Sequence, residues 1–178
     1  MDPQARLPLL VCLQFVAKKD WRMIIIDIEA SSLSEESYPI EIGWAHRHDP
    51  NQVDEFLIRP EPTWTDWAPE AQAVHGISQA ELRNHGISVH EAINRLNRYL
   101  EDKIVYSDRP GSELNWLIRL YRAGGFDSVP FHVRPVTSML PPSKVESFWR
   151  RLGATSTPHR ALTDARRIIK TLNYYGSD

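Results

Sequence analysis

A chain of 178 residues suits a single domain that can bury a hydrophobic core without disulfides. Its one cysteine, Cys12, excludes an internal disulfide and favours a reducing compartment. The net charge of −2 gives no sign of a polyanionic partner, but residues 1–102 carry 9 Lys and Arg against 17 Asp and Glu, whereas residues 103–178 carry 12 against 6. This asymmetry would suit a carboxylate metal site beside a phosphate-binding surface, and scattered solvated charges explain it about equally well.

Residues 1–21 are predicted to be an N-terminal appendage or an overextended start, which leaves residues 22–178 as the folded domain. The apolar run at residues 7–17 is too short to span a bilayer and is not followed by a convincing cleavage site. Met23 directly precedes a strand pattern, as a start codon would. We therefore expect a cytoplasmic protein with no membrane partner.

The predicted elements begin with three strands and continue with alternating helices and strands. A β-branched run at residues 23–28 is typical of a strand in the middle of a sheet, and residues 49–51 form a hairpin turn between the next two strands. Ser88 and Glu91 form a capping box at the start of a helix. The predicted strands are 23–28, 38–46, 53–59, 103–106 and 129–133, and the predicted helices are 68–74, 78–84, 88–100, 111–123, 143–152 and 160–173. This order predicts an α/β domain with a mixed five-stranded sheet flanked by helices.

Two carboxylates stand at the carboxyl end of the first predicted strand, in the segment Asp27-Ile28-Glu29. Positions i and i+2 of a strand point to the same face, so the two side chains project together where open α/β sheets place their ligands. Carboxylates this close repel each other unless a cation lies between them, and oxygen ligands suit Mg²⁺ or Mn²⁺. The alternative is a strand end that simply emerges into solvent.

A second pair, His159 and Asp164, lies at the start of the last predicted helix. A water that attacks a phosphodiester needs a base with a pKa near neutrality, and histidine supplies one. A surface histidine beside a solvated aspartate is the commoner explanation of such a pair on its own.

Two further acids flank the start of the helix predicted at residues 111–123. Asp108 ends a predicted strand, and Glu113 lies in the first turn of that helix. Either carboxylate could reach the carboxyl edge of the first strand if the two strands are neighbours.

Three segments resemble the motifs of the DnaQ-like 3′–5′ exonucleases. Residues 23–33 (MIIIDIEASSL) resemble the first motif, in which Asp-x-Glu holds the metals, and residues 73–78 (AVHGIS) resemble the family's His-Gly-Ile segment. Residues 158–165 (PHRALTDA) resemble the third motif in its histidine subtype (DEDDh), with His followed five residues later by Asp. The resemblance covers residues 23–175 and implies an RNase H-like fold.

The resemblance also implies a two-metal mechanism with Mg²⁺ or Mn²⁺. Asp27, Glu29 and Asp164 would hold one ion, and Asp27 with Glu113 would hold the other. His159 would act as the catalytic base that takes the proton of the attacking water.

The second motif departs from the family pattern. Residues 107–117 resemble the form Ser-Asp-x-Pro-x-x-Asp-x-x-Trp-Leu, with Glu113 at the position of the second Asp and Asp108 as the other acid. A glutamate keeps the charge of an aspartate but is longer by one methylene, so its side chain must adopt a different conformation to place the carboxylate at the metal. We favour Glu113 as the ligand, with Asp108 as the rival.

The family resemblance implies a binding site for single-stranded 3′ ends of DNA or RNA. Leu33 matches the apolar residue that wedges against the terminal bases, and Ser31 and Ser32 beside it could contact the 3′ end. His75 would shape the edge of the site. Two tryptophans in a proline-rich connection could stack on bases, namely Trp64 and Trp67.

Two other functions stay open on the sequence alone. One is a nucleic-acid-binding pseudoexonuclease, weakened because Glu113 replaces an aspartate. The other is a carboxylate-rich interaction domain that shares only the fold, because a fold by itself does not prove a function. Measuring the unfolding temperature during a divalent-metal titration would distinguish the interaction domain from the other functions. Only a protein with a metal site is stabilised by the added metal.

Overall fold

The computed structural model describes residues 23–154 and 159–175. The appendage expected at residues 1–21 lies outside these ranges. Within them, no helix combines the length and the apolar character that crossing a membrane requires.

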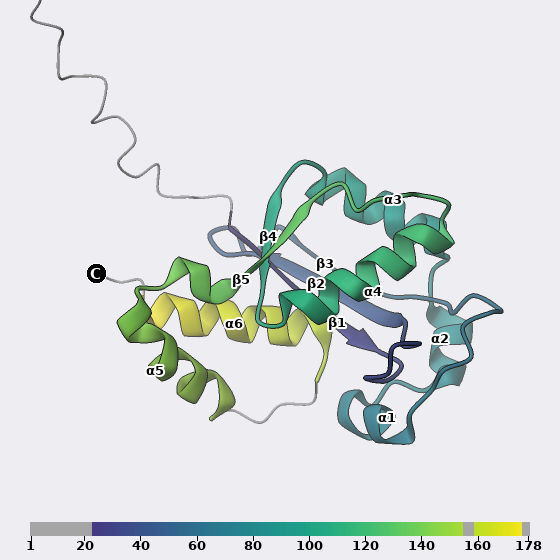
Figure 1. The fold of residues 1–178 in the computed structure, drawn as a ribbon, viewed down its shortest axis with the longest axis horizontal. Coiled ribbons are helices and arrows are strands. Elements are labelled where there is room, and N and C mark those ends of the chain that lie inside the picture. Colours follow the sequence, from purple (N-terminus) through teal and green to yellow (C-terminus); the bar gives the residue numbers. More distant parts are fainter. Residues whose placement is uncertain (1–22, 155–158, 176–178) are drawn as a thin grey trace, which may run out of the picture.

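A mixed five-stranded sheet forms the centre of the domain, in the order β3-β2-β1-β4-β5 (Figure 1). The central strand β1 (Ile24–Ala30) pairs antiparallel with β2 (Pro39–His46), which pairs antiparallel with β3 (Val53–Leu57). On its other side β1 pairs parallel with β4 (Ile104–Ser107), and β4 pairs parallel with β5 (His132–Pro135). The carboxyl ends of the three parallel strands therefore meet at one edge of the sheet. This is the α/β RNase H-like architecture that the sequence predicts.

Seven helical segments surround the sheet within the described residues. Two short helices and a longer one follow β3, one helix links β4 to β5, and the remainder follow β5 (Figure 1). In chain order they are α1 (Pro69–His75), α2 (Gln79–His85), α3 (Val89–Leu100), α4 (Pro110–Ala123), η1 (Val136–Met139), α5 (Pro142–Gly153) and α6 (Ala161–Tyr175).

Alternate residues of β1 contribute to two separate hydrophobic cores, as strand geometry requires. Ile24, Ile26 and Ile28 pack in a core with the buried residues of α3 and α4. Ile25 packs in a second core with those of α5 and α6. Asp27 continues the Ile25 side of the strand, so its carboxylate projects toward the layer that contains α6.

The predicted elements are confirmed, with shifts at the ends of three strands. β1 continues two residues beyond its predicted end, through Glu29 to Ala30. β3 ends two residues early, where Ile58 still donates a backbone hydrogen bond to the Ile40 carbonyl of β2 at 2.8 Å and forms a single parallel bridge with Ile87. The strand predicted at residues 129–133 was wrong by a few residues and lies at His132–Pro135. Pro130 has no N–H to donate to a ladder, and its carbonyl instead accepts a hydrogen bond from Asp102, at 2.9 Å, before β4 begins.

Gly43 of β2 allows α6 to cross the sheet in direct backbone contact. A Cβ on Gly43 would lie 2.2 Å from the backbone nitrogen of Leu162 and 2.6 Å from the carbonyl carbon of Ala161. Gly43 is also the cross-strand partner of Asp27. The first turn of α6 is therefore held beside the part of β1 that carries Asp27.

Replacing Gly43 by Ala is expected to destabilise the protein by about 1–3 kcal/mol, the usual range for overpacking a tight contact. The matched control is Gly111→Ala, because Gly111 lies in the first turn of α4 with open space around its Cβ position. That change should keep or raise stability, since alanine favours helices by about 1 kcal/mol over glycine. Urea unfolding of both variants measures the difference. Equal stability of the two variants would contradict the close approach of α6.

Candidate active site

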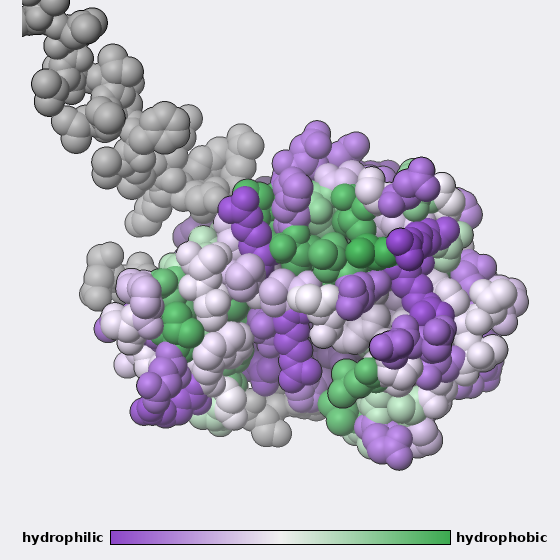
Figure 2. Space-filling model, in the orientation of Figure 1, coloured by the Kyte–Doolittle hydropathy of each residue, from purple (hydrophilic) through white to green (hydrophobic). Residues whose placement is uncertain are grey.

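The carboxyl ends of β1 and β4 meet the N-terminal ends of α4 and α6 at one edge of the sheet (Figure 1). In the same orientation, Figure 2 shows hydrophilic residues around this meeting point. A pocket of about 360 Å³ opens there. It is lined by every residue expected to be catalytic and by the rival acid of the second motif, namely Asp27, Glu29, Asp108, Glu113, His159 and Asp164.

One group of carboxylates consists of Asp27, Asp108 and Glu113. Each offers an oxygen, and these oxygens lie within 4.8 Å of one another. Ile25 pairs with Tyr106 in the parallel ladder, so the register extended by two residues sets Asp27 level with Asp108. Glu113 reaches the same point from the first turn of α4. Both candidates for the second-motif ligand therefore lie beside Asp27, and the choice between them stays a prediction.

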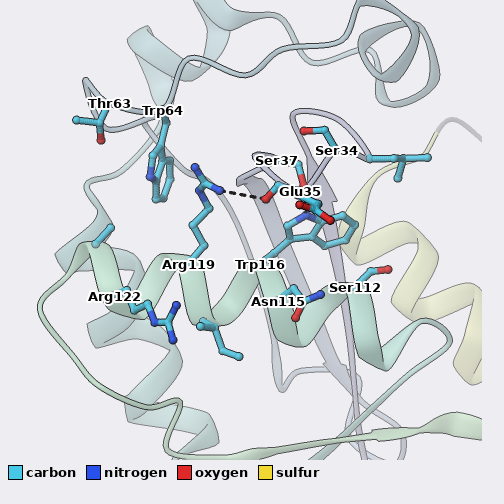
Figure 3. A pocket seen from close by; sticks show the side chains of 13 residues that line it. Ser34, Glu35, Ser37, Thr63, Trp64, Ser112, Asn115, Trp116, Arg119 and Arg122 are labelled. Atoms are coloured by element: carbon cyan, nitrogen blue, oxygen red, sulfur yellow. Dashed lines mark hydrogen bonds between the residues drawn. The ribbon is translucent and has the colours of Figure 1, made fainter.

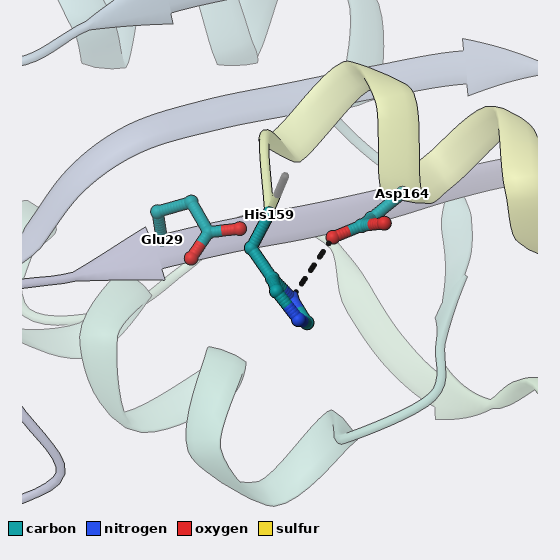
Figure 4. A group of neighbouring side chains, drawn as sticks. All are labelled: Glu29, His159 and Asp164. Carbon is teal, nitrogen blue, oxygen red and sulfur yellow. Dashed lines mark ion pairs between the residues drawn. The ribbon is translucent and has the colours of Figure 1, made fainter. Parts of the chain in front are cut away.

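A second group consists of Glu29, His159 and Asp164, whose potential ligand atoms also lie within 4.8 Å of one another. The Nδ1 atom of His159 lies 3.2 Å from Oδ2 of Asp164 (Figure 4). Asp164 is buried in the first turns of α6, whereas the His159 side chain is 47% exposed just before that helix begins. His159 can therefore contact both the carboxylates and a molecule that enters from solvent.

Burial of several carboxylates in one pocket disfavours their charged forms. Desolvation, followed by the charge of Glu113, raises the pKa of Asp27 well above its usual range. Burial likewise raises the pKa of Glu113. Burial, followed by the charge of Asp164, raises the pKa of Glu29 to about 7. Without a cation, the folded protein therefore holds protons in this pocket that the unfolded chain would release.

The metal-free protein is expected to lose stability as the pH rises through this range. The pKa of Glu29 is raised in the folded state from 4.5 to about 7, so its contribution is fully present below pH 4.5 and is lost as the pH rises through 7. The loss is roughly 3 kcal/mol at most. Urea unfolding in EDTA at pH 5 and pH 7.5 measures it, and Glu29→Gln should flatten the dependence. A metal-free protein that is more stable at pH 7.5 than at pH 5 would contradict this.

The donor atoms fit hard divalent cations. Both groups are rich in carboxylate oxygens, which suit Mg²⁺ or Mn²⁺. The Oε2 atom of Glu113 is buried with no hydrogen-bond partner among the described residues. Buried polar atoms are normally satisfied, so this oxygen has the character of a ligand atom.

Glu41 of β2 is a buried acid near the site that was not predicted from the sequence. It is the cross-strand partner of Glu29 and is fully buried. Its carboxylate accepts hydrogen bonds from the Arg160 guanidinium at 2.5 and 2.9 Å and from the Ala161 backbone N–H at 2.9 Å. The ion pair therefore ties the start of α6 to β2 and fixes the chain directly after His159.

Of the expected substrate-binding residues, Ser32, Leu33 and His75 line the pocket, and Ser31 does not. Leu33 lines it with its side chain 83% exposed, as a wedge would require. Ser31 and Ser32 are buried, and their hydroxyls donate hydrogen bonds to Asp66 at 3.2 and 2.5 Å. Their contact with a 3′ end stays a prediction. Because both hydroxyls are bonded to Asp66, such a contact would be made by the backbone atoms of these residues.

His75 and the tryptophans of the proline-rich connection have structural partners. The Nδ1 atom of His75 accepts a hydrogen bond from the Ile77 N–H at 3.0 Å, while its buried Nε2 has no hydrogen-bond partner in the described part of the chain. Trp64 is buried and stacks on Tyr38 with ring centroids 5.1 Å apart. Trp67 donates a hydrogen bond to Gln72. Seven pocket residues were not among the predicted site residues, namely Ile28, Ala30, Ala71, Val74, Arg109, Trp116 and Arg167.

The comparisons with known proteins agree with the geometry at the level of the fold. No family model matches the sequence, and no curated protein sequence matches it. Exonuclease I from Methylocaldum szegediense is similar in structure, with 14% identity and a TM-score of 0.64 over 83% of this chain and 38% of that one. E. coli Exonuclease I in complex with a dT13 oligonucleotide is 12% identical, with a TM-score of 0.69 over 87% and 41%. The zinc-bound form of the E. coli complex with single-stranded DNA is also 12% identical, with a TM-score of 0.63 over 84% and 39%.

At these identities the likeness shows the fold. The chain spans about two fifths of the length of these exonucleases. The central sheet and its helices are thus shared with nucleases, whereas activity, substrate and partners are argued from the site.

Proposed function

We propose that the protein is a divalent-metal-dependent 3′–5′ exonuclease that hydrolyses single-stranded DNA or RNA from the 3′ end. The observation that carries this proposal is the convergence of five acids and one histidine on one pocket, in two groups whose ligand atoms lie within 4.8 Å of one another. An interaction domain has no need to bury repelling carboxylates in this way, because their desolvation disfavours the folded state.

Five residues of the pocket have a chemical task in this reaction. Asp27 belongs to the group with Glu113, and the charges of Glu29 and Asp164 in the other group also act on it. It would therefore hold both ions, one together with Glu29 and Asp164 and the other together with Glu113. Divalent ions bound there would activate the attacking water and neutralise the charge that develops on the leaving 3′ oxygen. His159 is exposed enough to take the proton of that water and pass it to solvent.

Cleavage at a chain end, as opposed to internal cleavage, is supported by the form of the pocket around Leu33, and the 3′ end is what the family resemblance implies. An exposed apolar side chain at the mouth of an acidic pocket can pack on the last base, so that only the terminal phosphodiester reaches the carboxylates. The similar E. coli structures hold single-stranded DNA, which makes DNA the first substrate to test, with RNA beside it.

Degradation of 5′-labelled single-stranded DNA and RNA tests the proposal. With Mg²⁺ or Mn²⁺ we expect a ladder that shortens one nucleotide at a time from the 3′ end, and EDTA should abolish it. A 3′-phosphoryl blocking group should slow the reaction, whereas a 5′ block should not. Cleavage that is unchanged in EDTA, or immediate release of the 5′ label, would overturn the proposal.

A catalytically weakened pseudoexonuclease is the second candidate, because Glu113 stands where the family has aspartate. The position of the Glu113 carboxylate beside Asp27 supports an active enzyme, since the longer side chain still reaches the cluster.

Alanine variants at the two second-motif acids are expected to differ in their response to metal. Glu113→Ala should raise the Mn²⁺ concentration needed for half-maximal cleavage by about 10–100-fold, the scale for loss of a metal-site partner. Asp108→Ala should have a smaller effect, and Glu113→Asp should keep or increase activity because it restores the shorter family ligand. Cleavage rates across a Mn²⁺ titration measure all three. An inactive Asp108→Ala beside an unaffected Glu113→Ala would reverse the assignment.

A further inference from the structure

A second cavity, of about 820 Å³, opens beside the candidate active site and along α4. Leu33 and Trp116 line both cavities, so the two adjoin at these side chains. Figure 3 shows its polar residues on α4, on the loop after β1, and on the segment with Thr63 and Trp64. A chain that leaves the carboxylate cluster past Leu33 would enter this cavity.

The floor of the cavity is one face of α4. Ser112, Asn115, Arg119 and Arg122 are spaced by three or four residues, so they follow one another along the helix. At about 1.5 Å per residue the stripe is about 15 Å long, whereas a stacked strand advances about 3.4 Å per nucleotide. The stripe is therefore long enough to face several nucleotides, and it starts beside Glu113 in the first turn of the helix.

The walls of the cavity are held by polar contacts. Arg119 of α4 (Figure 3) donates a hydrogen bond to the Glu35 carbonyl at 3.4 Å. It also donates one to the Glu36 carboxylate at 3.0 Å, and the two bonds tie the loop after β1 to α4. The indole Nε1 of Trp116 donates to Ser37 Oγ at 2.7 Å. These contacts fix the shape of the cavity before any ligand enters.

Arg122, in contrast to Arg119, makes no contact of this kind with another described residue. It is exposed, and its guanidinium makes no hydrogen bond or ion pair with any other residue that the structure describes. Asn115 is likewise exposed, with a side-chain amide that can donate and accept. A guanidinium and an amide in a groove with aromatic walls match the phosphates and base edges of a single strand.

We propose that this cavity binds the nucleotides on the 5′ side of the terminal one, with Arg122 contacting a backbone phosphate and Asn115 contacting a base or sugar. The inference rests on the proposed function, since it places the 3′ nucleotide at the carboxylate cluster. The competing explanation is that Arg122 only complements the dipole at the C-terminal end of α4.

The test compares substrates that do and do not reach the second cavity. Hydrolysis of p-nitrophenyl thymidine 5′-monophosphate requires only the carboxylate cluster, whereas dT8 extends along α4. Arg122→Ala should leave the ester rate unchanged and raise KM for dT8 by about 3–10-fold, with a smaller effect for dT2. The salt slope of log K for dT8 binding should fall by about 0.7, because one single-strand phosphate contact is lost.

Arg98→Ala is the matched control, because Arg98 is also an exposed arginine in the last turn of a helix, α3. It should leave KM, the salt slope and ester hydrolysis unchanged. Equal effects of the two variants, or an unchanged KM of Arg122→Ala on dT8, would overturn the inference in favour of the dipole explanation.

Binding without cleavage separates this inference from the proposed function. Fluorescence anisotropy of labelled dT8 and dT2 in Ca²⁺ measures the affinity of the protein for each oligonucleotide, even if no substrate is cleaved. Tighter binding of dT8 than of dT2, lost in Arg122→Ala and Asn115→Ala, supports the cavity whatever the activity is. Equal affinity for dT8 and dT2 would refute the proposed role of the cavity. If the ester is still cleaved in that case, the proposed chemistry of the carboxylate cluster is unaffected.

Discussion

Asp27→Asn should abolish cleavage, with a loss on the order of 10²–10³-fold or more, the scale seen when one group that stabilises transition-state charge is removed. Asp27 is the carboxylate that both metal sites would share. Asparagine has nearly the same shape but no charge, so the variant loses the ligand without opening a cavity.

The same variant should not unfold the protein. Burial and the charge of Glu113 raise the pKa of Asp27, so the charged carboxylate is unfavourable in the metal-free fold. Without metal, the melting temperature of Asp27→Asn should therefore equal or exceed that of the parent at pH 7.5, while the stabilisation by Mn²⁺ should be lost. Asp127→Asn, on an exposed segment, is the matched control and should change nothing. Metal-dependent cleavage at the parent rate in Asp27→Asn would refute the assignment.

His159→Ala should lose on the order of 10²–10⁴-fold in cleavage rate, the usual contribution of a general base. The His159 side chain is 47% exposed and lies before the first turn of α6, so its removal should leave the fold intact. His90→Ala, at an exposed position of α3, is the control. Cleavage of labelled single-stranded DNA under single-turnover conditions measures the loss.

Mn²⁺ binding distinguishes two roles for His159. Its nitrogen lies close enough to Glu29 and Asp164 to be a ligand as well as a base. If it is the base, His159→Ala keeps the Mn²⁺-dependent rise in melting temperature and loses only the rate. A variant with the parent's rate would exclude both roles.

The sequence was informative where local spacing determines geometry. Asp27 and Glu29 could be paired from strand periodicity, and their place at the carboxyl end followed from the buried run before them. His159 and Asp164 were assigned to the same site through the family resemblance, and the structure brings them to the same pocket. Leu33 was predicted to wedge against the terminal bases, and this role stays a prediction although Leu33 lines the pocket and is exposed.

The contacts that the sequence did not reveal join residues far apart in the chain. Glu41 and Arg160 are separated by 119 positions, so no periodicity links them. Asp66 lies in a proline-rich connection that offers no pattern, yet it accepts hydrogen bonds from three serines of the loop after β1. The second cavity depends on how that loop packs against α4, which is a tertiary property.

Anomalous diffraction from crystals soaked with Mn²⁺ tests the central claim, that the cluster around Asp27 is the divalent-metal site of a nuclease. We expect Mn²⁺ peaks in contact with the Asp27 carboxylate, one shared with Glu29 and Asp164 and the other shared with Glu113. The same crystals of Asp27→Asn should lose these peaks. Mn²⁺ at saturating concentration that binds elsewhere and leaves the Asp27 cluster empty would contradict it.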